Sequence, residues 1–256
     1  MTVVADILNY IEEIAPSHLA AEWDNVGLLC GRKEQSVKKI LVALDPFETV
    51  CNEALAIGAD LIVTHHPLIF GNALSAVNDQ TQTGRCLLTL AENKISAINA
   101  HTNLDMAPGG INDTLATTVG LDKIEPASSD RLLRSGIVNK QPLSQFLSHV
   151  KNALRCDGLR YIDSGKPVHK VAVGGGSCAD CMYEAAAAGC DTFVTADVKY
   201  NQFRNAFELG INLIDAGHFH TENPAMPVLA DKLRSAFTDV EVVFSENHRD
   251  MMKYFV

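Results

Sequence analysis

Residues 40–64 read ILVALDPFETVCNEALAIGADLIVT, and this stretch decides the fold class. The apolar run Ile40–Leu44 predicts a short buried strand. Asp45-Pro46 follows as a candidate N-cap with proline in the first helical position, and Gly58 stands where a helix C-terminal glycine is expected. A second strand is predicted at Asp60–Thr64. A strand, a helix and a strand in succession are typical of α/β proteins with a parallel sheet.

The alternation of helices and strands continues on both sides of this stretch. Apolar residues at helical spacing predict a helix over residues 4–14. A further strand is predicted at Ile95–Ala100, and the polar, turn-rich stretch 120–136 is the expected domain junction. We therefore expect an α/β protein with one domain at residues 1–126 and a second at 127–256, whose C-terminal segment can pack back on the first.

The second half of the chain repeats the first. At an offset of 131 residues, Gly58 meets Gly189 and Asp60 meets Asp191, and Glu-Ala and Val-Thr pairs match beside them. At an offset of 117 residues, the segment that begins at His101 meets the segment that begins at His218. The matches predict two similar α/β domains from an internal duplication. Chance similarity between two generic strand–helix–strand units is the alternative.

Composition excludes several classes of protein. The 256 residues carry 21 Lys and Arg against 31 Asp and Glu, a formal net charge of -10, which makes duplex nucleic acid and anionic membranes unlikely ligands. No apolar run approaches the roughly 18 residues that a membrane span needs. The acidic, amphipathic segment Met1–Ala15 is not expected to be a signal peptide. Seven scattered cysteines indicate reduced thiols and a cytoplasmic location.

Three polar clusters follow predicted strands. They are His65-His66, His101 with Asp105, and His218 with Glu222. Open α/β sheets place their sites at the carboxyl ends of strands, and imidazoles and carboxylates are the usual ligands of divalent transition metals. The spacing of four residues puts each His and its acidic partner on one face of a helical turn. A metal site is therefore predicted, although any single one of these residues could be an ordinary half-buried polar side chain.

A rival site lies in the second half. Residues 171–173 predict a strand, and Gly174–Ala179 after it satisfies G-x-G-x-x-A, with Asp197 about 20 residues further on, as in a dinucleotide fingerprint. A glycine-rich tight turn is the preferred interpretation, because the matching turn of the first repeat has no glycine. Cys178 and Cys181 form a C-x-x-C pair without a second pair, which indicates buried or idle thiols. No cofactor-binding residue is assigned.

Together these stretches resemble the family of GTP cyclohydrolase type-two homologues, also called NGG-interacting-factor-like proteins. The resemblance covers nearly the whole chain and is carried by Trp23–Leu28, Thr64–Pro67, His101–Asp105, Thr195–Tyr200 and Asp215–Glu222. It implies two similar α/β domains with a two-metal centre in the cleft between them, and assembly as a ring-shaped homohexamer. The sequence departs from the family pattern after Thr195. Ala196 stands where the family often has glycine, and Asn201 stands near the position of a family histidine.

Carried over residue by residue, the resemblance implies five metal ligands. They are His65, His66, Asp105, His218 and Glu222, with Glu222 as the bridge. His101 would stand beside the metals as the catalytic residue for proton transfer, because the ordinary pKa of histidine lies near neutrality. His220, between two of the ligands, could add a ligand or a proton donor.

The implied activity is that of a dinuclear-metal-dependent hydrolase acting on a nucleotide, including GTP ring opening with formate release. Mixed His and carboxylate ligands suit zinc, iron, manganese or nickel. Two ions (+4) with Asp105 and Glu222 (-2) leave about +2 locally, which suits a small phosphorylated substrate. A non-enzymatic metal-binding scaffold or regulatory interaction protein is the alternative function.

Overall fold

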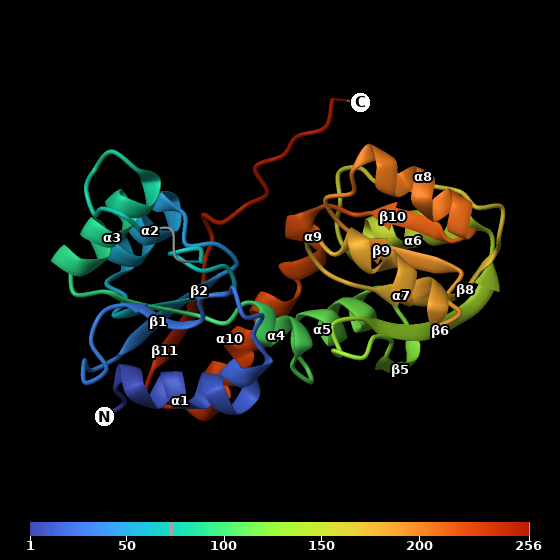
Figure 1. Cartoon of the computed structure of the whole chain (residues 1–256). Coiled ribbons are helices and arrows are strands. Elements are labelled where there is room, and N and C mark those ends of the chain that lie inside the picture. Colours follow the sequence, from blue (N-terminus) through green and yellow to red (C-terminus); the bar gives the residue numbers. More distant parts are fainter. Residues whose placement is uncertain (72–73, 256) are drawn as a thin grey trace. The chain divides into compact units, whose positions relative to one another are not determined.

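Two units, each with its own β-sheet, make up the structure, which is a computed structural model that describes residues 1–71 and 74–255 (Figure 1). Unit 1 comprises Met1–Ala107 and Met226–Arg249, and unit 2 comprises Pro108–Ala225 and Asp250–Val256. Helices and strands alternate along most of the chain, so the predicted α/β class is confirmed.

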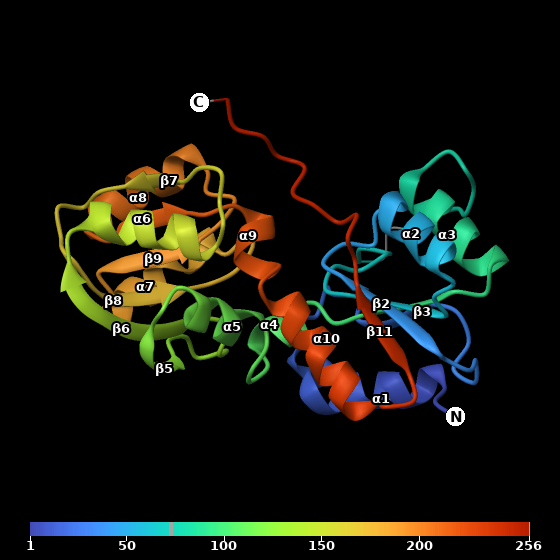
Figure 2. The same cartoon turned by 180° about the vertical axis from the view of Figure 1, so that it is seen from behind.

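Unit 1 is built on a five-stranded sheet in which four neighbouring strands are parallel. In spatial order the strands are β1 (Gly27–Cys30), β4 (Ser96–Asn99), β3 (Leu61–Thr64), β2 (Lys39–Ala43) and β11 (Glu241–Phe244), with β1 antiparallel at one edge. The helical elements are α1 (Val4–Ile14), η1 (Ser17–Leu19), α2 (Glu48–Ile57), α3 (Gln82–Glu92), α4 (Thr102–Met106) and α10 (Ala225–Ala236). Figures 1 and 2 show α2 and α3 over one face of the sheet, and α1 and α10 over the other. Covered on both faces, the central strands are almost fully buried, as parallel strands usually are.

The predicted strand–helix–strand stretch is present, with one correction at the helix start. Gly58 ends α2 in the left-handed conformation (φ +67°), as its sequence position predicts. The N-cap is Phe47 rather than Asp45. Asp45 lies two residues before this N-cap, and its carboxylate accepts hydrogen bonds from the imidazoles of His66 and His248 instead.

Unit 2 is built on a six-stranded mixed sheet. In spatial order the strands are β5 (Asp122–Pro126), β6 (Arg134–Gln141), β8 (Val168–Val173), β9 (Thr192–Thr195), β10 (Asn212–Asp215) and β7 (Arg160–Ile162). Only β8, β9 and β10 are mutually parallel. The helical elements are α5 (Ile111–Thr118), α6 (Leu143–Ala153), η2 (Ala179–Cys181), α7 (Met182–Ala187), α8 (Tyr200–Leu209) and α9 (His218–Glu222).

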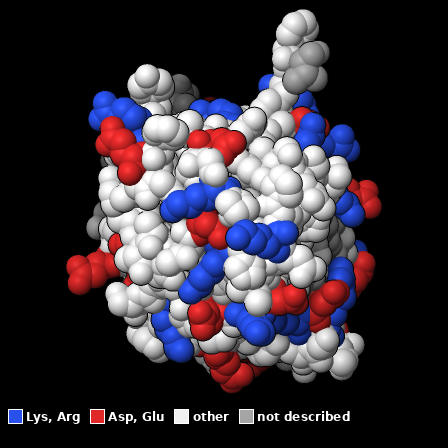
Figure 3. Space-filling model, turned by 90° about the vertical axis from the view of Figure 1, so that its right-hand side faces the viewer, with Lys and Arg blue, Asp and Glu red and all other residues white. Residues whose placement is uncertain are grey.

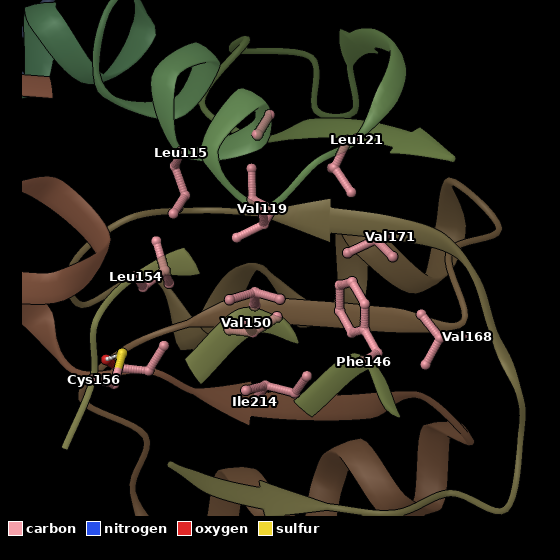
Figure 4. Packing of buried hydrophobic residues seen from close by; sticks show 14 of the residues in the cluster. Leu115, Val119, Leu121, Phe146, Val150, Leu154, Cys156, Val168, Val171 and Ile214 are labelled. Atoms are coloured by element: carbon pink, nitrogen blue, oxygen red, sulfur yellow. Dashed lines mark hydrogen bonds between the residues drawn. The ribbon is translucent and has the colours of Figure 1, made fainter. Parts of the chain in front are cut away.

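The core of unit 2 lies on both faces of its sheet. Apolar side chains of α5 and α6 pack on one face, and Figure 4 shows Phe146 and Val150 of α6 beside Val171 and Ile214 of the sheet. Side chains of α7 and α8 pack with the sheet in a second cluster, which includes Phe193. The outer surface of this unit mixes Lys and Arg with Asp and Glu across the face seen in Figure 3, as a solvated surface does.

The division of the chain differs from the expected boundary at residues 126 and 127. Residues 108–126 belong to unit 2, because α5 packs on β6 and β8 while β5 pairs with β6. The polar stretch expected to be a junction is therefore partly strand. All five residues of β5 are exposed, which explains their polar composition. Residues 226–249 return to unit 1, where β11 pairs with β2.

Matching contacts occur in the two sheets at the offset of 131 residues. The backbone N–H of Lys39 donates to the Asp60 carboxylate at 3.0 Å, and that of Lys170 donates to the Asp191 carboxylate at 2.9 Å. The ammonium group of each lysine also donates to a backbone carbonyl at the end of the following helix, at 3.1 and 2.9 Å. Shared contacts of this detail are consistent with an internal duplication.

The second offset changes by one residue within the repeat. Strand register makes Asn99 of β4 equivalent to Asp215 of β10, whereas an offset of 117 residues would pair Ile98 with Asp215. The additional residue is Gly217, whose φ of +83° suits glycine. After it, His218 takes the place that follows the strand, so the offset of 117 residues is restored from that point.

Two sequence expectations concern membranes and thiols. Among the helices of residues 1–71 and 74–255, none combines the length and apolarity that crossing a membrane requires. All seven cysteines lie in these residues, and each is a free thiol.

Candidate metal centre

Three histidines of unit 1 come together at the carboxyl ends of two neighbouring parallel strands. His65 and His66 follow β3, and His101 follows β4. One ring nitrogen from each lies within 4.8 Å of those of the other two. The three rings are packed with centroids 4.9 to 5.5 Å apart. The strand order therefore assembles a group of imidazoles that could bind a metal ion.

Each of these rings is oriented by a hydrogen bond from its Nδ1 atom. His65 Nδ1 donates to a backbone carbonyl at 2.9 Å, so its proton is on Nδ1. His66 Nδ1 donates to Asp45 at 2.6 Å, and His101 Nδ1 donates to Asp24 at 2.8 Å. This arrangement leaves Nε2 of each ring as the nitrogen that could ligate a metal ion. Such outer partners fix the tautomer and direction of metal-ligating histidines.

Asp45 joins two histidines that are far apart in the sequence. Its Oδ1 accepts from His66 and its Oδ2 accepts from His248 Nε2 at 2.8 Å. Burial raises the pKa of the Asp45 carboxyl, but the hydrogen bonds from His248 and His66 outweigh it and hold the pKa well below its usual range. His248 is buried here, whereas the sequence offered no setting for it. Asp45 could have been found from its place at the end of β2.

Asp24 has the same role for His101. Its side chain is fully buried and accepts hydrogen bonds from His101 and from the backbone N–H of Thr102 at 3.0 Å. Burial raises the pKa of Asp24, but the hydrogen bonds from His101 and Thr102 outweigh this effect and hold the pKa well below its usual range. The Trp23–Leu28 motif was noted in the sequence, but its acidic residue was not recognised as the partner of His101.

The acidic residue of the first His-x-x-x-acid motif also reaches this group. Asp105 lies in α4, one helical turn after His101, with its Oδ1 3.6 Å from His65 Nε2. The carboxylate is mostly buried, with 13% of its side chain exposed. Unit 1 thus brings together His65, His66, His101 and Asp105, all four of the residues that the sequence selected in this half.

Unit 2 carries the second His-x-x-x-acid motif on the single turn of α9. His218 Nε2 lies 3.0 Å from Glu222 Oε2, and His218 Nδ1 lies 2.7 Å from Asp197 Oδ2. Asp197 has a φ of +52°, unusual for a residue other than glycine. It follows β9 as His66 follows β3 in unit 1. The repeat thus supplies a carboxylate here in place of an imidazole.

The carboxylates keep His218 protonated. Burial lowers its pKa, but the hydrogen bonds with Asp197 and Glu222 outweigh this and raise the pKa to about 10. The hydrogen bond with His218 in turn lowers the pKa of Asp197. The pair of carboxylates is therefore an environment for a cation, and a metal ion bound by His218 would replace the proton.

The glycine-rich loop of unit 2 makes room for this motif. A Cβ atom on Gly176 would lie 2.1 Å from Glu222 Oε1 and 3.1 Å from His218 Nε2. The backbone N–H of Gly175 donates to Asn112 at 2.7 Å and that of Gly176 to the Thr221 hydroxyl at 3.0 Å. The glycines thus serve a close side-chain approach. These engaged donors favour the tight-turn interpretation over a phosphate cradle.

The remaining candidates have contacts of their own. His220 Nδ1 donates to the Leu154 carbonyl at 3.2 Å, and its Nε2 lies 3.1 Å from Asp250. Cys178 is buried in a hydrophobic cluster, and its hydrogen bond with Cys181 lowers the pKa of the Cys181 thiol. These contacts support structural roles for all three.

Two cavities of unit 1 differ in their relation to the histidines. A cavity of about 210 Å³ is lined by His66, Asp45 and Phe47 among others. A larger cavity of about 840 Å³ is lined by Arg32 and Lys94, at the opposite end of the sheet. Pockets that enclose drug-sized ligands have about 300–1,000 Å³. The smaller cavity adjoins His66, and it has room for only part of such a ligand.

The fold and these side chains define a class: an α/β protein whose strand ends carry histidine and carboxylate groups that could bind metal ions. The family model described as Duf34/NIF3 (NGG1p interacting factor 3) matches residues 2–251, and the chain belongs to this family. The expected family resemblance is therefore confirmed.

Individual relatives agree with this membership. The chain is 35% identical to a protein of Clostridium perfringens named "GTP cyclohydrolase 1 type 2 homolog", over 97% of this chain and 98% of the relative. A crystal structure of a Bacillus cereus protein related to NIF3 has the same fold, with a TM-score of 0.93 at 24% identity over 100% of this chain and 99% of that one. A Staphylococcus aureus hypothetical protein is similar, with a TM-score of 0.90 at 27% identity over 99% of both chains.

Proposed function

We propose that this protein is a dinuclear-metal-dependent hydrolase that acts on a nucleotide, with GTP ring opening and formate release as its reaction. The convergence of His65, His66 and His101, each oriented through Nδ1, is the observation that carries the proposal. Metal-ligating histidines commonly donate a hydrogen bond from the ring nitrogen that does not bind the metal, and all three of these histidines do so. The names of the curated relatives supply the choice of GTP.

The proposed ligands come from both units. His65, His66 and Asp105 of unit 1 and His218 and Glu222 of unit 2 would hold two divalent metal ions. Neutral imidazole and carboxylate donors suit zinc, iron, manganese or nickel. The burial of His65 and Glu222 supports this set, because buried titratable groups with outer partners are typical of functional sites.

The chain's own residues have distinct parts in this proposal. When bound, the metal ions would supply Lewis acidity and lower the pKa of a water molecule. Asp24 keeps a proton on His101 Nδ1, so that Nε2 is the ring nitrogen left for proton transfer. Asp45 orients His66 in the same way. His101 is therefore the proposed proton-transfer residue, and the two aspartates position imidazoles.

Metal analysis of untreated protein together with a formate-release assay on GTP tests the proposal. We expect about two metal ions per chain and formate release that a chelator abolishes. His65→Ala is expected to lose metal. His169→Ala is the matched control, because His169 is exposed and its Nδ1 donates to the backbone carbonyl of Val138. Metal-replete protein that releases no formate would refute the GTP reaction.

His101→Ala separates proton transfer from ligation. A proton-transfer residue predicts that this variant keeps its metal and loses formate release. Loss of one metal ion would instead make His101 a ligand, which its position beside His65 and His66 also permits. Full turnover with metal bound would remove His101 from the mechanism.

A non-enzymatic metal-binding scaffold or regulatory interaction protein is the second candidate. The family's description as an interacting factor favours it. Protein that holds metal but is inert toward GTP and a panel of other nucleotides would support this alternative. Under either function we propose a ring-shaped homohexamer, to be checked by light scattering, and a cytoplasmic location, which the seven free thiols support.

A further inference from the structure

Two exposed aromatic rings border the histidine group of unit 1. The side chain of Trp23 is 56% exposed and that of Phe70 is 60% exposed. Their ring centroids lie 5.5 Å apart with a tilt of 35°. The centroid of His101 is 5.9 Å from that of Trp23 and 6.1 Å from that of Phe70. Large apolar rings that gather on the surface are typical of binding sites.

The backbone beneath these rings is tied to the histidine group. Asp24, next to Trp23, is buried against His101. The side-chain amide of Asn25 donates to the carbonyl of Ile69, next to Phe70, at 2.9 Å. Asn99 of β4 donates to the Asn25 carbonyl at 3.0 Å. The two rings are thus held in place through their neighbours, while their own surfaces stay exposed. Such preorganisation lowers the entropy cost of binding a ligand.

We propose that Trp23 and Phe70 form a stacking platform that binds the planar purine base of the substrate, next to His101. The inference rests on the proposed function and extends it to substrate recognition. Every nucleobase has a π-face that stacks on aromatic side chains, and one such stack contributes substantially to affinity. The tilt between the rings lets one of them contact the face of a base while the other contacts its edge. The base would then lie within reach of the proposed proton-transfer residue.

Fluorescence of the platform itself gives a direct measurement. Trp23 is the only tryptophan of the chain, so its emission reports on this surface alone. Metal-replete protein would be titrated with guanosine monophosphate and, separately, with ribose 5-phosphate, which has no base. We expect saturable quenching by the nucleotide only. Absent quenching, or equal quenching by ribose 5-phosphate, would overturn the platform.

A pair of phenylalanine variants adds a matched comparison. Phe70→Leu should weaken guanosine monophosphate binding about tenfold, as expected for loss of one aromatic contact. Phe207→Leu in α8 of unit 2 removes an equally exposed ring, at 57%, and should leave the dissociation constant unchanged. Equal affinity of both variants and the wild type would overturn the proposal. A smaller assembly for Phe70→Leu in light scattering would overturn it too, by assigning this face to a contact between copies of the chain.

The formate assay separates this proposal from the proposed function. Formate release from GTP with an unchanged KM in Phe70→Leu would overturn the platform and leave the hydrolase standing. Base-dependent quenching of Trp23 without formate release would uphold the platform and refute the GTP reaction.

Discussion

The substitution Gly176→Ala tests whether the glycine loop of unit 2 exists to admit Glu222. The added Cβ would lie 2.1 Å from Glu222 Oε1, far inside van der Waals contact. Because this oxygen ends a flexible side chain, the carboxylate moves and the backbone stays. We therefore expect the variant to fold with Glu222 displaced, and to hold less metal than the wild type.

The magnitude follows from two separate effects. Gly176 has a φ of +60°, and a residue with a Cβ in this left-handed region loses about 1–2 kcal/mol of stability. Gly189→Ala is the matched control, because its φ is +77° and its Cβ would meet nothing within 4 Å. Both variants should lose about 1–2 kcal/mol in urea denaturation. Only Gly176→Ala should also lose metal, in the manner of a substituted ligand or outer partner, whose loss costs about 10–100-fold in affinity.

Metal titration of the purified variants gives the decisive result. Unchanged metal affinity and metal content in Gly176→Ala would refute the assignment of Glu222 as a ligand, provided that its stability loss matches that of Gly189→Ala. Loss of metal in both variants would refute the specific role of the contact with Glu222.

Three further predictions concern stability. Because the pKa of Asp24 is lowered in the folded state, its contribution to the free energy of unfolding is present above the unfolded pKa of about 3.9 and is lost as the pH falls below that value. The free energy of unfolding of Asp24→Asn, measured by urea denaturation, should therefore fall less between pH 7 and pH 3 than that of the wild type. An equal fall in the variant and the wild type would contradict this. Asp60→Asn and Asp191→Asn should each lower the free energy of unfolding by about 1–3 kcal/mol in the same assay, because each carboxylate accepts hydrogen bonds from two backbone N–H groups. Strongly unequal losses in the two variants would argue against equivalent roles of the two aspartates. Phe146→Ala should cost about 3–5 kcal/mol, because the ring is fully buried in the core of unit 2, and a loss below 1 kcal/mol would show that the core closes around the gap.

The domain boundary shows where sequence patterns cease to be informative. The strand–helix–strand periodicity around residues 40–64 is local, so the elements could be predicted from it. The polar composition of β5 predicted a junction, yet its backbone hydrogen bonds with β6 make it an edge strand. The return of residues 226–249 to unit 1 depends on the pairing of β11 with β2. Nothing within residues 226–249 specifies this partner.

The candidate metal centre shows the same difference between local sequence patterns and contacts made by distant residues. The sequence by itself determined which histidines follow strands, because a short apolar run and the polar residue after it are adjacent in the chain. Only the tertiary structure decided which groups orient them. Asp24 and His101 are 77 residues apart, and Asp45 and His248 are 203 residues apart. Such pairs arise from strand order and from the return of the C-terminal segment. The physical reason is that a hydrogen bond needs atoms within about 3 Å, and only the folded chain brings residues so distant in sequence to that separation.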